Sequence, residues 1–125
     1  MIIGHGVDIV SIPRMHQSLK KQGDRFLKKI FTEKEIHYCQ KKAAPSLHFA
    51  ARFSAKEACL KALQTGFSQG MYFKDISIEV KSFGAPVLKL TGSVLKRAKK
   101  MGANHFFVSL SHEKNYAIAS VILTK

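Results

Sequence analysis

The sequence predicts an α+β fold that forms a single domain over residues 1–125. Segments with strand and helix patterns are mixed along the chain, without the regular alternation typical of a parallel α/β sheet. Both ends of the chain have strand patterns, and the best helical segment lies between them at residues 47–65. The length suits one domain, and 46% hydrophobic residues are typical of a chain with a packed core.

The first strand is expected over residues 2–10, where apolar residues alternate with glycines and one aspartate. Ser11 and Pro13 are typical of a helix start, and Gly23 is typical of a helix end. A short helix is expected over residues 24–30, capped by its first residue.

Two further helices are predicted between Thr32 and Gly66. Thr32 and Glu35 fit a capping box, which predicts a helix of about ten residues. Ser46 is expected to cap the long helix over residues 47–65, which then ends at Gly66. Four side chains form the apolar stripe of this helix: Phe49, Phe53, Leu60 and Leu63.

The second half of the sequence predicts two paired strands, a basic helix and a closing hairpin. These elements are expected at residues 73–80 and 87–90, between Thr91 and Gly102, and at residues 106–111 and 116–123.

The composition is strongly basic, with 21 Lys and Arg against 8 Asp and Glu and a net charge of +13. This charge predicts an anionic partner, and nucleic acid, an acidic protein, anionic lipid and a polyphosphate ligand all qualify. No apolar run approaches the roughly 20 residues that span a bilayer, and the first residues lack the features of a secretory signal. Cys39 and Cys59 form no C-x-x-C pair, which favours reduced thiols in a cytoplasmic protein.

Asp8 is unusual because it lies inside an apolar strand, where a carboxylate loses hydration that must be compensated. Gly4 and Gly6 share its face of the strand, and their missing side chains leave room for a ligand or ion to approach the backbone. Two plainer interpretations stay open: Asp8 caps the following helix, or it pairs with a lysine.

Glu57 lies in the middle of the long helix, at the edge of the apolar stripe, with Lys61 four residues further on. The plainer interpretation is an ion pair between these two residues at the core boundary. The alternative is that Glu57 faces Asp8. Two carboxylates without a cysteine or histidine cluster suit Mg²⁺, which completes its shell with water and the phosphate oxygens of an anionic substrate. The other six carboxylates have polar or turn-like surroundings: Asp24, Glu33, Glu35, Asp75, Glu79 and Glu113.

Two other groups of residues are candidates for binding. Arg14 and Lys21 fall on one face of the first helix, which is either a solvated face or a docking surface for an acidic protein. Residues 109–112 (Ser-Leu-Ser-His) end a strand, where hydroxyls and an imidazole suit either a phosphate contact or a turn cap. They do not form the G-x-S-x-G pattern of a nucleophile elbow.

Taken together, these segments resemble the bacterial holo-acyl-carrier-protein synthases, the small 4′-phosphopantetheinyl transferases. Residues 6–14 (GVDIVSIPR) resemble the first motif of that family, and residues 52–63 (RFSAKEACLKAL) resemble the second, with its Lys-Glu-Ala-x-x-Lys-Ala core. Other similar segments, in the expected order, are residues 31–35, 84–88 and 109–112. Residues 81–83 replace a more polar turn of the family, and His5 between two glycines is also unusual.

The resemblance implies an enzyme that transfers 4′-phosphopantetheine from coenzyme A to a serine of apo-acyl carrier protein. The reaction depends on Mg²⁺, releases adenosine 3′,5′-bisphosphate and supports fatty acid biosynthesis. The implied fold is a small, mainly antiparallel sheet packed against a long central helix with further short helices. The implied assembly is a homotrimer with active sites between subunits, and Arg14 would help to dock the acidic carrier protein.

The resemblance also implies roles for individual residues. Asp8 and Glu57 are the expected metal ligands and, with Lys61, the expected catalytic residues. Lys61, Arg52 and His112 are the expected contacts to coenzyme A. The general base that accepts the serine proton is either a metal-associated water or a nearby carboxylate.

A small basic nucleic-acid-binding module without catalytic activity is the alternative from another functional class. The sequence has no RNP-like aromatic pattern, no GXXG loop and no zinc-finger spacing. We therefore expect coenzyme A and apo-acyl carrier protein as partners, and neither nucleic acid nor a membrane.

Overall fold

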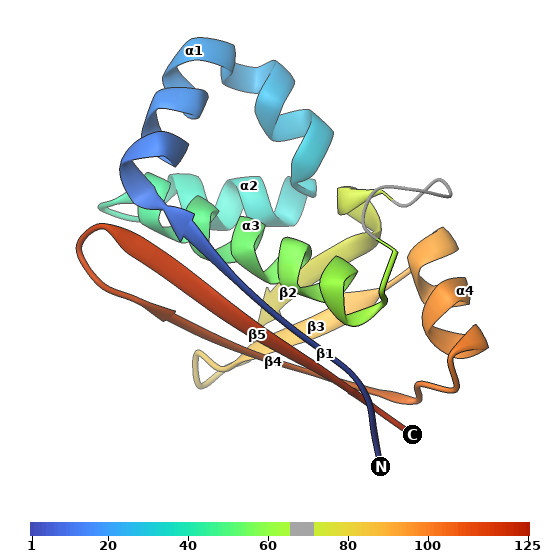
Figure 1. The fold of residues 1–125 in the computed structure, drawn as a ribbon. Coiled ribbons are helices and arrows are strands. Elements are labelled where there is room, and N and C mark those ends of the chain that lie inside the picture. The colour runs from blue at the N-terminus through green and yellow to red at the C-terminus, as the bar shows by residue number, and fades with distance from the viewer. Residues whose placement is uncertain (66–71) are drawn as a thin grey trace.

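The computed structural model describes residues 1–65 and 72–125, and it confirms the α+β class (Figure 1). The elements follow in this order: β1 (Ile2–Ser11), α1 (Ile12–Ile30), α2 (Glu33–Gln40), α3 (Pro45–Ala62), the 3₁₀ helix η2 (Phe73–Asp75), β2 (Ile76–Val80), β3 (Pro86–Leu90), α4 (Gly92–Lys100), β4 (His105–His112) and β5 (Tyr116–Thr124). None of the described helices is long and apolar enough to cross a membrane.

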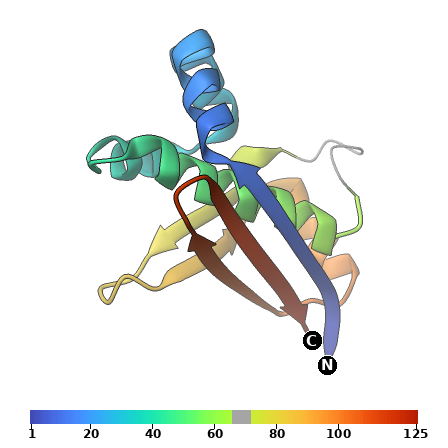
Figure 2. The ribbon, with the colours of Figure 1, turned by 60° about the vertical axis from the view of Figure 1, so that its left-hand side comes forward.

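Two antiparallel sheets surround the helix α3. The larger sheet has the strand order β1-β5-β4, and β2 and β3 form a separate hairpin. The first strand pairs with the last, with Gly6 opposite Val121 and Asp8 opposite Ala119, so the two ends of the chain lie side by side (Figures 1 and 2). This pairing joins residues more than one hundred positions apart in the sequence and places Asp8 on a strand that α3 covers.

The predicted start of the chain and the helix α2 are confirmed. The backbone of α1 is interrupted at Gly23, where φ is +55°, so α1 consists of the two helical segments that the sequence predicts. At the start of α2, the Thr32 hydroxyl accepts from the Glu35 amide and the Glu35 carboxylate accepts from the Thr32 amide. This is the predicted capping box.

Three predicted boundaries are wrong. Ser46 does not cap α3, because the helix starts at Pro45 and the Ser46 hydroxyl instead contacts His16 Nδ1 at 3.0 Å. The helix ends at Ala62, before Gln64 with its φ of +60°, and the predicted stop at Gly66 lies outside the described residues. The predicted strand over residues 73–80 begins as the 3₁₀ helix η2 and extends only from Ile76.

The helix α3 is buried on almost all sides rather than along one stripe. Small residues such as Ala55, Ala58 and Ala62 are fully buried, which lets the neighbouring elements approach its backbone closely. The larger sheet lies in front of α3 in Figure 2. Its outer face carries exposed apolar side chains. These are Val7, Ile9, Phe107, Tyr116 and Ile118.

Candidate active site

Asp8 and Glu57 line one open pocket of about 350 Å³. The pocket lies between the end of β1, the start of α1 and the middle of α3. Phe26 from the second half of α1 and Phe53 from α3 form its aromatic walls, and Arg14 also lines it. The structure therefore brings together two carboxylates that are 49 positions apart in the sequence.

The glycines of β1 explain why the two carboxylates share a pocket. A Cβ atom on Gly6 would overlap the carbonyl oxygen of Ala58, and one on Gly4 would lie 2.5 Å from the carbonyl oxygen of Ala62. The expectation that these glycines leave room for a ligand is wrong, because the backbone of α3 fills the space. Only glycine permits such a close approach of strand and helix.

Lys61 pairs with Asp8 across this strand–helix contact, which confirms the plainer interpretation that Asp8 pairs with a lysine. Its Nζ lies 3.0 Å from Asp8 Oδ1 and donates to the carbonyl oxygen of Val7 at 3.1 Å. The pair between Glu57 and Lys61 is not among the ion pairs of the described residues, so that simpler interpretation of Glu57 is wrong. Asp8 does not cap α1 either, because the Ser11 hydroxyl accepts from the Arg14 amide at the helix start.

Burial is the first cause that raises the pKa of Glu57, and the negative charge of Asp8 is the second. The ammonium group of Lys61 opposes this shift. Two neighbouring carboxylates in a half-buried pocket are stabilised by a cation between them. No group of three or more His, Cys, Asp or Glu side chains in residues 1–65 and 72–125 is arranged to hold a metal. The hard oxygen donors of this pair match Mg²⁺, which in proteins often has only one or two carboxylate ligands.

Arg52 and His112 lie outside the Asp8–Glu57 pocket, in a basic cluster formed with Lys42 and His48. The Arg52 guanidinium is buried, stacks on the Tyr38 ring at 4.3 Å and donates to the carbonyl oxygen of His48 at 3.3 Å. Burial is the main cause that lowers the pKa of His48, and the positive charges of Arg52, Lys42 and His112 lower it further. The cluster therefore has unbalanced positive charge, and Arg52 Nε is buried without a partner among the described residues.

The pocket at His112 adjoins the Asp8–Glu57 pocket through Ile9. This second pocket, of about 440 Å³, is lined by the end of β4 and the start of β5, and Ile9 lines both pockets. The side chains of Ser111 and His112 are exposed there. Asp8 and Glu57 therefore lie on a part of the surface next to the strand end at Ser111 and His112, which is a candidate for phosphate contact.

The two basic residues of α1 are separated by the structure. Arg14 lines the Asp8–Glu57 pocket, whereas Lys21 lies further along α1 and does not line it. Both side chains are exposed. Of these two residues, only Arg14 is therefore in contact with the Asp8–Glu57 pocket.

The sequence interpretation missed three contributors to this region. Phe26 carries no signal of a pocket wall in the sequence, and the pattern of Phe53 indicates only the apolar stripe of α3. The sequence predicts polar surroundings for Glu35, but its side chain is buried and paired with Lys56 at 2.8 Å. The capping box with Thr32 already accounts for a carboxylate at Glu35, and no pattern in the sequence indicates that this side chain faces α3.

Comparison with known proteins identifies the family of the chain. Residues 4–121 match the model of the 4′-phosphopantetheinyl transferase superfamily. A holo-[acyl-carrier-protein] synthase from Koribacter versatilis is 45% identical over 123 residues, which is 98% of each chain. One from Syntrophus aciditrophicus is 46% identical over 98% of this chain and 96% of its own.

Solved structures lead to the same family. The crystal structure of the holo-[acyl-carrier-protein] synthase from Neisseria meningitidis superposes with a TM-score of 0.90, at 33% identity over the whole of both chains. The enzyme from Helicobacter pylori in complex with coenzyme A superposes with a TM-score of 0.84, at 33% identity over 96% of this chain and 99% of its own. These similarities give no support to the nucleic-acid-binding alternative. The chain belongs to the 4′-phosphopantetheinyl transferase superfamily and, within it, to the holo-acyl-carrier-protein synthases.

Proposed function

We propose that this protein transfers 4′-phosphopantetheine from coenzyme A to a serine of apo-acyl carrier protein, as a step that supports fatty acid biosynthesis. The observation that carries the proposal is that Asp8 and Glu57 line one pocket while Lys61 is paired with Asp8. Full-length similarity to holo-[acyl-carrier-protein] synthases supports it, and so does the coenzyme A bound by the Helicobacter pylori relative.

Asp8 and Glu57 are the residues proposed to hold Mg²⁺. Their shared pocket fits a divalent cation, and so does the raised pKa of Glu57, which is caused by burial and by the charge of Asp8. When bound there, Mg²⁺ would neutralise charge that develops on the pyrophosphate of coenzyme A.

In the proposed reaction, the serine oxygen forms a bond to the phosphorus next to pantetheine. The bond from this phosphorus to the bridging oxygen of the pyrophosphate breaks, adenosine 3′,5′-bisphosphate leaves, and a base accepts the serine proton. Lys61 uses two of its three donors on Val7 and Asp8, and the third can reach a phosphate oxygen. The role of Lys61 is to hold Asp8 in place and to bind that oxygen.

The basic cluster of Lys42, His48, Arg52 and His112 is proposed to bind further phosphate groups of coenzyme A. The buried and unpaired Nε of Arg52 supports this, because a buried donor without a partner costs free energy that an anion can recover. Surplus positive charge around His48 supports it as well. His112 of this cluster lines the second pocket, and Ile9 lines both that pocket and the one with Asp8 and Glu57.

Arg14 and Lys21 are proposed to dock the acidic carrier protein. Arg14 lines the pocket that would receive the serine, and Lys21 extends the positive surface along α1. The net charge of +13 would attract both a polyanionic donor and an acidic protein.

A homotrimer in the cytoplasm is proposed as the working form. The exposed apolar side chains of the larger sheet, such as Ile9, Phe107 and Ile118, form a face that soluble proteins usually cover with a partner. Ile9 belongs both to this face and to the two pockets, so a neighbouring subunit would lie beside the site. The buried free thiols of Cys39 and Cys59 support a reducing compartment.

Mass spectrometry of the carrier protein tests the proposed function. With apo-acyl carrier protein, coenzyme A and Mg²⁺, the product should be heavier by one phosphopantetheine. Asp8→Asn and Glu57→Gln should abolish this change, and excess chelator should do the same. Asp24→Asn is the matched control, because Asp24 is an exposed carboxylate of α1. Full activity of both site variants, or full activity in chelator, contradicts the assignment of the metal pair.

A further inference from the structure

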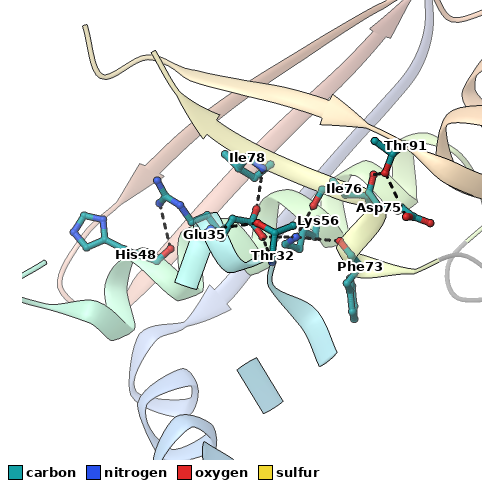
Figure 3. Close-up of polar contacts among 10 residues, drawn as sticks. Thr32, Glu35, His48, Lys56, Phe73, Asp75, Ile76, Ile78 and Thr91 are labelled. Carbon is teal, nitrogen blue, oxygen red and sulfur yellow. Dashed lines mark hydrogen bonds and ion pairs between the residues drawn. The ribbon is translucent and has the colours of Figure 1, made fainter. Parts of the chain in front are cut away.

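Glu35 and Lys56 form a buried ion pair (Figure 3), and Lys56 is the residue before Glu57 in α3. Their side chains are 1% and 0% exposed, and Lys56 Nζ lies 2.8 Å from Glu35 Oε1. Both carboxylate oxygens of Glu35 also accept backbone hydrogen bonds, one from Thr32 at 2.9 Å and one from Ile78 at 2.8 Å. The carboxylate therefore joins the start of α2, the strand β2 and the helix α3.

Lys56 uses its two remaining donors on the chain that leads into β2. Its Nζ donates to the carbonyl oxygens of Phe73, at 3.0 Å, and Ile76. An ammonium group has three donors, so all of them are engaged. The direction of the Lys56 side chain, and with it the rotation of α3 about its axis, is set by partners on three other elements, α2, η2 and β2.

The same pair supports both aromatic walls of the Asp8–Glu57 pocket. The Phe73 ring packs against Phe53 with centroids 5.4 Å apart. Lys56 Nζ lies 5.7 Å from the centroid of Phe31, whose ring contacts Phe26 edge to face at 6.4 Å. Phe53 and Phe26 line the pocket.

Burial of this pair is not explained by stability alone. A buried ion pair loses hydration on both charges, and apolar residues of similar size are often as stable in the same place. Apolar side chains do not supply directional bonds to two carbonyl oxygens and two amides. The pair therefore contributes orientation, and Glu57 is the next residue of α3.

We propose that Glu35 and Lys56 are positioning residues of the transferase reaction, which together hold Glu57 and the aromatic walls of the pocket in their working arrangement. This inference rests on the proposed function, since it assigns Glu57 to the site. Neither residue touches the pocket itself, because both are buried and neither lines it. They act through Glu57, Phe53 and Phe26.

The decisive variant is the double substitution Glu35→Gln with Lys56→Met, which removes both charges and keeps both side-chain lengths. Because no unpaired charge is left behind, we expect it to fold, with a thermal unfolding midpoint close to that of the unaltered protein. Glu35→Gln alone is the milder second variant, since the amide oxygen still accepts from Ile78. Val94→Ala is the control for lost stability, because Val94 is a buried residue of α4 that does not line the pocket.

Two measurements separate positioning from a purely structural role. In the double variant, kcat should fall about 10- to 100-fold while KM for apo-acyl carrier protein stays the same, because small displacements of reacting groups cost rate rather than docking. Calorimetric titration with Mg²⁺ in the presence of coenzyme A should also show weaker binding. Val94→Ala should lower the unfolding midpoint and leave kcat and Mg²⁺ affinity unchanged.

The inference is overturned if the folded double variant keeps the kcat and Mg²⁺ affinity of the unaltered protein. If the double variant does not fold, unchanged kcat and Mg²⁺ affinity in Glu35→Gln overturn it instead. Failure of the proposed function has a different signature, since the unaltered protein would then leave the mass of apo-acyl carrier protein unchanged. A fully active Glu57→Gln would instead reject the assigned role of Glu57. An inactive Glu57→Gln with a fully active double variant rejects the positioning role alone.

Discussion

Gly6 of β1 lies directly against the backbone of α3 at Ala58, so closely that a Cβ atom on Gly6 would overlap the Ala58 carbonyl oxygen. Ala58 is the residue after Glu57, and Asp8 is two residues after Gly6 on the same face of the strand. The contact between the two backbones therefore sets the separation of the two carboxylates. The candidate site depends on a residue that has no side chain.

Gly6→Ala is expected to damage both stability and activity. The added methyl group must push β1 and α3 apart, and such overpacking costs about 1–3 kcal/mol of unfolding free energy. We expect at least a tenfold loss of kcat, measured by carrier-protein mass, because a shift of the carboxylates disturbs their geometry. Gly84→Ala is the control: nothing lies within 4 Å of its added Cβ, and its φ of +79° gives a purely local cost. Normal activity and stability in Gly6→Ala would show that the contact is not restrictive.

Lys61→Met is expected to lower kcat by about 10²-fold, because it removes a charged donor from the developing negative charge and leaves Asp8 unpaired. The Asp8 side chain is only 16% exposed, so water compensates this loss poorly. Lys61→Arg keeps the charge and should retain more activity than Lys61→Met. Equal activities of the two variants in steady-state kinetics would exclude a role for the positive charge.

Glu57→Gln is expected to stabilise the metal-free protein near neutral pH. Burial and the charge of Asp8 raise the pKa of Glu57 in the folded state, so the ionised carboxylate is less favourable there than in the unfolded chain. Above its folded-state pKa, ionised Glu57 therefore lowers the free energy of unfolding. This penalty disappears below the unfolded-state pKa of about 4.3, where the carboxyl group is protonated in both states. Denaturant unfolding in chelator should show a gain for Glu57→Gln at pH 7 that vanishes near pH 4. Glu113→Gln, at an exposed position, should show no such gain.

Arg14→Glu is expected to raise KM for apo-acyl carrier protein about tenfold or more while kcat changes little, because like charges on the two partners oppose their encounter. The effect should shrink at high salt, where the remaining attraction is screened. Lys99→Glu makes the same charge change on the exposed surface of α4 and should have a smaller effect on KM. An equal rise in KM for both variants would point to net charge rather than to a docking surface.

Cys39 and Cys59 are expected to resist alkylation in the folded protein. Burial raises the pKa of each thiol to about 12, so almost no thiolate is present at pH 8. Mass spectrometry should find both thiols unlabelled by iodoacetamide until denaturant is added. Rapid labelling of either thiol under native conditions would contradict the packing described here.

Local structure and the types of chemical group in the site can be predicted from the order of residues along the chain. Thr32 and Glu35 are close enough in the chain to form a capping box from their own spacing, and Gly23 breaks α1 because of its own backbone freedom. Asp8 was identifiable because an aspartate inside an apolar strand requires compensation. These features depend on neighbours within a few residues, which a pattern along the chain contains.

The tertiary structure alone decided which distant groups meet. Asp8 lies beside Glu57 because β1 pairs with β5 and Gly6 packs closely against α3. As a result, Lys61 forms its ion pair with Asp8 rather than with Glu57. The same packing turned Glu35 from a helix cap into the buried partner of Lys56. Spacing within one helix does not contain this information, because burial and the choice of ion-pair partner depend on elements that arrive from elsewhere in the chain.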